Sequence, residues 1–237
     1  MDAETRANLE QISVATISMQ LLKRGIRHSA MVGVRPLNVP AKPVIGEAFT
    51  LRNIPMREDL SSPEVLAHRE NAQRRAIEEA PAGTVLVIDG RGRGDVAVLG
   101  DILIERLKLR RVTAMVSDGG IRDADECLGA DFPIYAAGPA APASITFHFA
   151  ADLQCPIGCG GIAVMPGDVI VADGDGVIVV PKALASEISR DGIEQERYER
   201  FAKLRVSQGH PVPGIYPPND DAKAEYAEWF AAGNSEN

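Results

Sequence analysis

The chain has 237 residues, 45% of them apolar and 24% charged, and its 33 acidic and 25 basic residues give a net charge of −8. This composition is ordinary for a globular protein with a buried core. No apolar run approaches the roughly 18 residues of a membrane-spanning helix, and the start is acidic, unlike a signal peptide. The acidic balance and the 5% of aromatic residues disfavour nucleic-acid binding. We expect a soluble chain whose partners are small molecules, metals or other protein chains, with no membrane partner.

The cysteines indicate the compartment. There are three, an odd number that does not make a disulfide framework. Cys155 and Cys159 are also too far apart for a Cys-x-x-Cys motif, and packing or a turn is the simpler interpretation of that pair. These features predict a protein of the reducing cytoplasm.

The first third of the chain predicts two helices and one strand. Apolar residues at helical spacing predict an amphipathic helix over 5–23. The proline-rich segment 34–43 predicts a loop, and the alternating segment 46–51 a strand. Helix formers over 68–80 predict a polar surface helix that Pro81 ends.

The centre of the chain is the most regular part. Aliphatic runs over 84–88 and 112–116 predict buried strands, and the segment 99–109 between them predicts a helix. This is a strand-helix-strand unit, which favours an α/β fold.

Shorter elements follow. Turn residues divide the predicted strands 133–135, 161–164, 168–172 and 176–180, of which the last three suggest a meander closing a sheet or barrel. A long helix is expected over 181–209, from Pro181 in its first turn to about Ser207, with Gly209 as its stop, and the proline-broken tail 210–237 carries a short helix with Trp229. Because no linker rich in Gly, Ser or Pro divides the chain, we expect a single domain over 1–237.

A glycine-rich turn follows the first central strand. Gly90, Gly92 and Gly94 invite a dinucleotide-binding interpretation, but a Rossmann fingerprint needs its third glycine three positions after the second. The spacing here is different, and a simple turn is the favoured interpretation.

Two further segments carry chemistry. Gly100 and Asp101 begin the central helix, whose unpaired N–H groups could bind a substrate carboxylate at Gly100, Asp101, Ile102 and Leu103, although an Asp there is most often a helix cap. After the next strand, Arg122 and Asp123 are adjacent and point in different directions. They suit a carboxylate and a cation of one ligand, with a surface ion pair as the alternative.

The remaining polar residues give weaker signals. None of the four histidines stands at the i,i+4 spacing of a helical metal pair, so each is expected to be structural. Residues 173–176 resemble part of a calcium loop but lack its downstream ligands, so a hairpin turn is predicted. The histidines are His28, His68, His148 and His210.

The spacing of these motifs resembles the RraA-like family. Gly94-Asp95 and Gly100-Asp101 precede a helix and a strand, and Asp118-Gly119-x-x-Arg122-Asp123 follows, within a resemblance that spans 16–209. The family includes divalent-metal-dependent class II aldolases acting on 4-hydroxy-4-methyl-2-oxoglutarate, non-catalytic regulators of a ribonuclease, and members mislabelled as menaquinone methyltransferases. The resemblance implies a compact α/β/β/α fold of the swivelling-domain type around a barrel-like sheet, in trimers or pairs of trimers with active sites between subunits.

The resemblance also implies roles for individual residues. Asp123 matches the ligand of Mg²⁺ or Mn²⁺, Arg122 the contact to substrate and developing enolate, and Asp101 the residue holding a metal-bound water. The backbone of Gly100 to Leu103 matches the pyruvate-carboxylate cradle. Glu199, with Glu196 next, matches an acidic residue that reaches in from the C-terminal helix of a neighbouring subunit.

The implied function is cleavage of a 4-hydroxy-2-keto acid through a metal-stabilised pyruvate enolate, with oxaloacetate decarboxylation as a side activity. One departure concerns the substrate: many members carry an Asp after Thr-x-Ser in the N-terminal helix, where this chain has Met19. The alternative is a protein-binding regulator without catalysis. Retention of Asp101, Arg122 and Asp123 together favours the enzyme. A methyltransferase is disfavoured, because it needs a cofactor-binding loop that this sequence does not supply.

Overall fold

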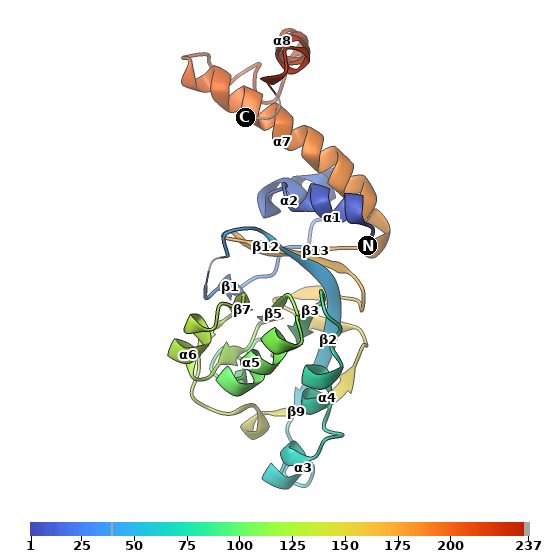
Figure 1. The fold of residues 1–237 in the computed structure, drawn as a ribbon, viewed down its shortest axis with the longest axis vertical. Coiled ribbons are helices and arrows are strands. Elements are labelled where there is room, and N and C mark those ends of the chain that lie inside the picture. Colours follow the sequence, from blue (N-terminus) through green and yellow to red (C-terminus); the bar gives the residue numbers. More distant parts are fainter. Residues whose placement is uncertain (39, 235–237) are drawn as a thin grey trace.

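The computed structural model describes residues 1–38 and 40–234. Their centre is a mixed eight-stranded sheet in the order β1-β7-β5-β3-β2-β12-β13, with β9 also paired to β2 (Figure 1). The strands are β1 (Arg35–Pro36), β2 (Val44–Pro55), β3 (Val85–Ile88), β5 (Ala114–Ser117), β7 (Ile134–Ala136), β9 (His148–Leu153), β12 (Val169–Asp173) and β13 (Gly176–Val180).

The long strand β2 bends the sheet because it pairs with three other strands along its length. Residues 44–47 pair antiparallel with β12, residues 48–51 pair parallel with β3, and residues 51–55 pair antiparallel with β9. The register shifts between Arg52 and Asn53, where a bulge increases the local bend. The result is the α/β fold with a nearly closed, barrel-like sheet that the sequence predicts.

Parallel pairing joins β2, β3, β5 and β7 across the middle of the sheet. Strands of this kind are covered on both faces, and every residue of β3 and β5 is buried. This explains the aliphatic runs that predict the two strands. It also places their carboxyl ends at one edge, where α/β proteins usually bind ligands.

A small parallel sheet continues from that edge. Its strands β4 (Ala97–Leu99), β6 (Gly120–Ile121) and β8 (Gly138–Pro139) follow β3, β5 and β7 along the chain. The strands are close: a Cβ on Gly120 would lie 2.5 Å from the Cβ of Ala140 and 2.8 Å from the carbonyl oxygen of Gly94. Because β4 ends just before Gly100 and β6 just before Arg122, this sheet brings the two candidate segments together.

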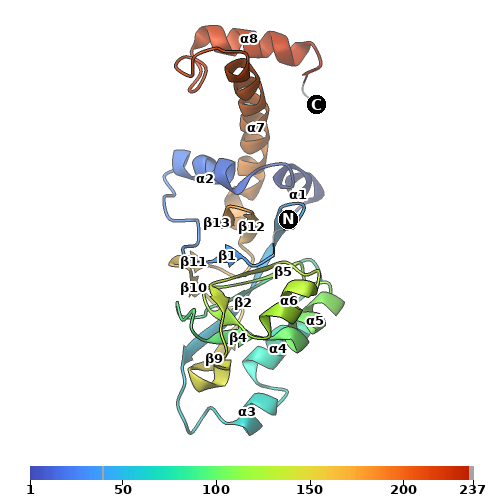
Figure 2. The same ribbon diagram turned by 90° about the vertical axis from the view of Figure 1, so that its left-hand side faces the viewer.

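Helices cover two sides of the sheet (Figure 2). On one side α4, α5 and α6 share a buried cluster with β3, which includes Ile77, Ile104 and Leu86. On the other, α1, α2 and the start of α7 pack on β12 and β13 through Ile17 and Ile188. The helices are α1 (Ala3–Leu9), α2 (Val14–Lys23), α3 (Pro63–Ala67), α4 (Ala72–Glu79), α5 (Asp101–Leu109), α6 (Ala124–Gly129), α7 (Ala185–Ser207) and α8 (Asp220–Ala231), with single 3₁₀ turns η1 (Ser144–Thr146) and η2 (Lys182–Leu184).

The N-terminal helix predicted over 5–23 is two helices. Ser13 is extended and accepts a hydrogen bond from the N–H of Thr16, so it caps a new helix, α2, in the middle of the apolar pattern. The pattern continues across the break because Leu9 and Ile17 enter the same buried cluster. The spacing of apolar residues therefore predicts the buried face correctly but does not predict the break between α1 and α2.

The helix predicted over 68–80 is shorter and less exposed than expected. Asn71 caps α4 by accepting hydrogen bonds from the N–H groups of Gln73 and Arg74, while His68 ends the separate helix α3. Gln73 and Ile77 are buried, so one face of α4 belongs to the core.

Two other boundaries differ. The predicted helix 99–109 begins at Asp101, because the residues before Gly100 form β4. The expected meander is a hairpin of β12 and β13 alone, since β11 (Ile162–Val164) pairs with β10 (Ile157–Cys159) in a separate ribbon. The turn at 173–176 is the predicted hairpin turn, in which the Asp173 carboxylate accepts from the N–H of Asp175 at 2.9 Å.

The C-terminal helices form an arm. In Figures 1 and 2, α7 leaves the body beside α1 and α2 and carries α8 across its far end. Ring contacts among Tyr198, Phe201, Tyr226 and Trp229 hold α8 against α7. No helix in the described residues combines the length and the apolar composition needed to cross a bilayer.

Candidate active site

The first part of the site is the start of α5. Gly100 is its N-cap and has an extended backbone with φ −135°. Its carbonyl accepts from the N–H groups of Leu103 and Ile104 at 3.2 and 3.1 Å. Leu103 is therefore paired, whereas the N–H groups of Asp101 and Ile102, at the first two helical positions, lack an intrahelical carbonyl and are available to an anion.

The second part is the segment after β6. The N–H of Arg122 donates to the carbonyl of Leu99 at 2.9 Å, which fixes this segment beside Gly100. Asp123 has the left-handed conformation, with φ 51°, and its side chain does not cap α6. It points toward α5: a Cβ on Gly100 would lie 2.7 Å from Asp123 Oδ2 and 3.5 Å from the Cβ of Arg122.

A buried thiol supports both parts. Cys127 Sγ donates to the carbonyl of Arg122 at 3.2 Å, and burial raises the pKa of this thiol to about 11, with the charges of Asp101 and Asp123 adding to the shift. Both carboxylates therefore lie within electrostatic reach of one sulfur. The thiol stays protonated at neutral pH and acts as a hydrogen-bond donor. The only signal of Cys127 in the sequence is its place one turn after Asp123.

An open hollow of about 340 Å³ adjoins these residues. Arg122 and Asp123 form its polar wall, with both side chains exposed, and Pro139, Ala140 and Ala141 form an apolar wall at the end of β8. A small molecule in this hollow could contact a guanidinium and a carboxylate at once.

The donor set suits a hard cation held by few protein ligands. The described residues contain no group of three or more His, Cys, Asp and Glu side chains arranged to hold a metal. Asp123, with Asp101 nearby, supplies carboxylate oxygens, and Mg²⁺ commonly binds one or two carboxylates while keeping several waters. The residues present therefore fit Mg²⁺ or Mn²⁺.

The glutamates of α7 are not part of this site within one chain. Glu199 accepts from Gln195 and from the Tyr216 hydroxyl, at 2.8 and 3.0 Å, on the arm that points away from α5 and α6 (Figure 1). Glu196 accepts from the N–H and hydroxyl of Ser13, both at 2.9 Å, and so helps to begin α2. A second copy of the chain would be needed to bring either glutamate to Asp123.

The glycine-rich segment after β3 is a turn tied down by Asp118. The Asp118 carboxylate accepts from the N–H groups of Gly90, Gly92 and Gly160 at 2.7, 3.0 and 3.1 Å. These N–H groups are therefore occupied, which supports the turn over a phosphate-binding loop. A Cβ on Gly90 would lie 2.2 Å from the nitrogen of Gly119, so the two glycine segments can approach only without side chains.

The remaining candidates lie elsewhere. All three cysteines are free, and burial raises the pKa of the Cys159 thiol well above its ordinary value. His148 is buried, whereas the other three histidines are exposed.

Comparison with known proteins gives the same family as the motifs. The model of the RraA-like family, described as Aldolase/RraA, matches residues 13–179. A protein of Halalkalibacterium halodurans, provisionally named a 4-hydroxy-4-methyl-2-oxoglutarate aldolase, is 39% identical over 133 residues, 56% of this chain and 63% of that protein. The protein DlpA of Legionella pneumophila is 27% identical over 213 residues, 88% of this chain.

A solved structure extends the likeness. RraAS2 of Streptomyces coelicolor, described as an unusual member of the RNase ES inhibitor RraA protein family, has a TM-score of 0.75 and 33% identity, and the match covers 86% of this chain and 98% of that one. The matches span 33% of the length of DlpA and 63% of the H. halodurans protein. The arm formed by α7 and α8 lies outside the residues matched by the family model.

Proposed function

This chain belongs to the RraA-like family, and on that premise we propose that it is a divalent-metal-dependent carbon–carbon lyase that releases pyruvate from a 4-hydroxy-2-keto acid. The name of the H. halodurans relative supports an aldolase. The observation that carries the proposal is the approach of the Asp123 carboxylate to Gly100, with Arg122 beside it.

Three groups of this chain would hold the substrate. The N–H groups of Asp101 and Ile102 at the start of α5 suit its carboxylate, because they lie at the positive end of the helix dipole and do not donate within the helix. The Arg122 guanidinium can donate to the carboxylate and to the keto oxygen, where negative charge grows as the bond breaks. The Pro139–Ala141 wall leaves room for the rest of the molecule.

The reaction also needs proton transfers. Cleavage breaks the C3–C4 bond, the hydroxyl at C4 loses a proton, and C3 of the resulting enolate gains one to give pyruvate. Asp101, half-buried at the first turn of α5, is placed to accept or return a proton through an ordered water. A Mg²⁺ or Mn²⁺ held by Asp123 would supply Lewis-acid stabilisation of the keto acid.

The assembly belongs to the same proposal. A trimer or a pair of trimers would allow Glu199 on the arm of one subunit to approach Asp123 of the next, and Glu199 would then act in the proton transfers. We also place the reaction in the cytoplasm, in keeping with the free thiols.

A regulator of a ribonuclease is the second candidate, favoured by the description of RraAS2. It needs a binding surface and no chemistry at Asp123. The experiment that separates the two follows pyruvate release from 4-hydroxy-4-methyl-2-oxoglutarate and decarboxylation of oxaloacetate, with and without EDTA. Metal-dependent turnover of both compounds supports the lyase, and absence of both activities at every metal concentration supports the regulator.

A further inference from the structure

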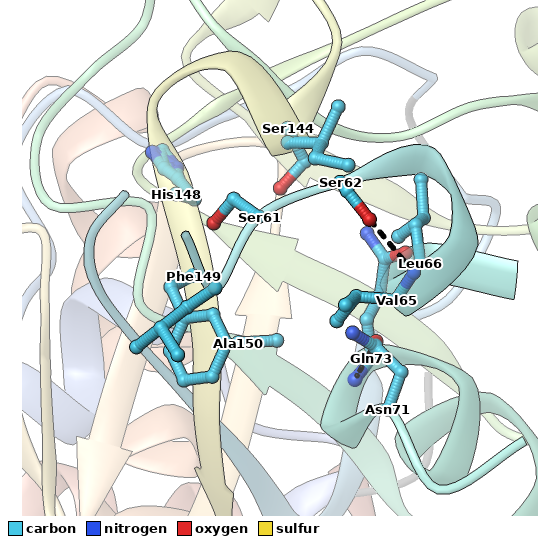
Figure 3. A pocket seen from close by; sticks show the side chains of 12 residues that line it. Ser61, Ser62, Val65, Leu66, Asn71, Gln73, Ser144, His148, Phe149 and Ala150 are labelled. Atoms are coloured by element: carbon cyan, nitrogen blue, oxygen red, sulfur yellow. Dashed lines mark hydrogen bonds between the residues drawn. The ribbon is translucent and has the colours of Figure 1, made fainter. Parts of the chain in front are cut away.

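A small pocket lies between the start of β9, η1 and the segment 60–66 (Figure 3). His148, at its end, is only 3% exposed, and neither of its ring nitrogens has a hydrogen-bond partner among the described residues. The Ser61 hydroxyl beside it is also buried without a partner. Buried polar groups are nearly always paired with protein, water or ligand, so two such groups at one pocket mark a place where a hydrogen-bonding molecule would be held.

His148 would offer that ligand a neutral ring. Burial, together with the smaller effect of the nearby cations of Arg91 and Arg93, lowers the pKa of His148 to about 4. A neutral imidazole presents one N–H donor and one acceptor nitrogen. Together with the Ser61 hydroxyl, the pocket offers both donors and acceptors to one ligand.

The lining of the pocket is uncharged. None of its 12 residues is Asp, Glu, Lys or Arg, and Ser61, Ser62 and Ser144 contribute hydroxyls. The space inside the pocket is about 20 Å³, which holds one water, so a larger ligand enters only if a neighbouring element moves. The pocket adjoins a groove of about 530 Å³, with which it shares Val65 and Phe149, and this groove is the way in for a larger ligand.

The helix α3, which lines both the pocket and the groove, is weakly held. α3 contains no buried residue, and its N-cap bond from the N–H of Val65 to the Ser62 hydroxyl is long, at 3.3 Å. Arg74 Nε donates to the carbonyl of Leu66 at 3.1 Å and ties the end of α3 to α4. A helix with so few buried contacts can move aside at low cost.

The groove disfavours an anion. Glu64, Glu70 and Asp152 line it, and Arg75 is its one basic residue apart from a histidine. Arg75 is already paired with Glu79, Nε to Oε1, at 2.7 Å. At the inner end, Arg93 pairs with Asp95 and Arg91 donates to the carbonyl of Phe147. An uncharged ligand meets no repulsion along this path.

The pocket is also near the candidate active site. Ala141 lines the hollow at Asp123 and Ser144 lines the pocket, and three residues of extended chain span at most about 11 Å. Gln73, another lining residue, donates to the carbonyl of Val98 at 2.7 Å, two residues before Gly100.

We propose that this pocket binds a small uncharged compound carrying a carbonyl and a hydroxyl group, which hydrogen-bonds to His148 and Ser61. The choice of class rests partly on the proposed function, because cleavage of a 4-hydroxy-2-keto acid whose C4 carries no carboxylate yields an uncharged aldehyde or ketone beside pyruvate. The pocket would hold a compound of that class next to the site that forms it.

The test compares hydroxyacetone with pyruvate, two three-carbon ketones that differ in charge, on metal-free protein with ¹⁵N-labelled histidine. Hydroxyacetone should shift the ring nitrogens of His148 saturably, and pyruvate should not. The signals of His28 and His210, which are exposed, serve as internal references. Ser61→Ala should weaken binding at least about tenfold, whereas Ser186→Ala, an exposed serine on α7, should not change it.

Three results would overturn the proposal: no saturable shift at His148, equal shifts with pyruvate, or unchanged binding by Ser61→Ala. His148→Phe, followed through the signals of hydroxyacetone itself, should abolish binding, and Ser61→Ala decides the question if that variant does not fold. The binding test needs no turnover, and the proposed function is tested separately by oxaloacetate decarboxylation, which forms no second carbonyl compound. A failure of hydroxyacetone to bind is therefore distinct from a failure of the proposed function.

Discussion

The Asp123 carboxylate occupies the space where a side chain at position 100 would begin, with Oδ2 2.7 Å from the position of a Cβ on Gly100. Gly100 is extended, with φ −135°, so its backbone does not require glycine. The absence of a side chain there is explained by the carboxylate, which needs the space.

Gly100→Ala therefore tests the geometry of the site. The added methyl would displace Asp123, and we expect kcat for oxaloacetate to fall about 10- to 100-fold while the free energy of unfolding changes by about 1 kcal/mol or less. Steady-state rates and urea unfolding measure the two effects. Gly129→Ala, at the end of α6 with open space around its Cα, is the matched control and should keep full activity. Equal rates in all three proteins would contradict the assignment.

Asp123→Asn and Arg122→Ala test the roles of the two exposed residues. Asn tolerates the left-handed conformation of position 123, so the first variant should fold normally and lose more than about 100-fold in kcat through loss of a charged ligand. Removal of the Arg122 guanidinium should cost on the order of 10²–10³. Asp125→Ala, an exposed change two residues away, should have no effect on rate. If Asp123→Asn and Arg122→Ala both kept wild-type rates, the active site would have to lie elsewhere in the protein.

Cys127 gives a pH prediction. Its pKa is raised from 9.0 to about 11 in the folded protein, mainly by burial, so the unfolded chain loses this proton at lower pH. The folded state then binds more protons between pH 9 and 11, and stability falls as pH rises through that window, by up to about 2–3 kcal/mol. Urea unfolding at several pH values should show this loss in wild type but not in Cys127→Ser, which keeps a donor to the Arg122 carbonyl. Parallel pH profiles for the two proteins would refute it.

A shared site can be tested by mixing subunits. Asp123→Asn and Glu199→Gln should each be inactive alone if Glu199 reaches Asp123 of a neighbour. Co-expressed chains should recover about a quarter of wild-type activity, since one site in four then combines an intact Asp123 with an intact Glu199. Light scattering should give the mass of a trimer or hexamer. A mass of one chain, or no recovery on mixing, would exclude the shared site.

The sequence predicts the parts of the fold that rest on local pattern. The β3-α5-β5 unit follows from aliphatic runs around an amphipathic segment, and the start of α5 at Asp101 lies within the predicted range. The break at Ser13 is missed because the buried face continues across it. β4, β6 and β8 are missed because two- and three-residue strands leave no periodicity.

The residues of the candidate site also fall into those that the sequence predicts and those that it does not. Its glycines, acids and arginine are visible as motifs, but their convergence depends on the parallel order of β3, β5 and β7 and on the small sheet beyond them. Cys127 and the unpaired His148 give no sequence signal, because their roles depend on burial and on hydrogen bonds across the fold. Whether Glu199 completes the site depends on a second chain.

The most direct test of the proposed function is oxaloacetate decarboxylation by metal-free protein titrated with Mn²⁺ or Mg²⁺, with the protein-free rate subtracted at each metal concentration. We expect a rate that rises saturably with metal in wild type, returns to background with EDTA, and remains near background for Asp123→Asn at every metal concentration. Turnover that persists in metal-free protein, or metal-dependent turnover that Asp123→Asn retains in full, would contradict the account.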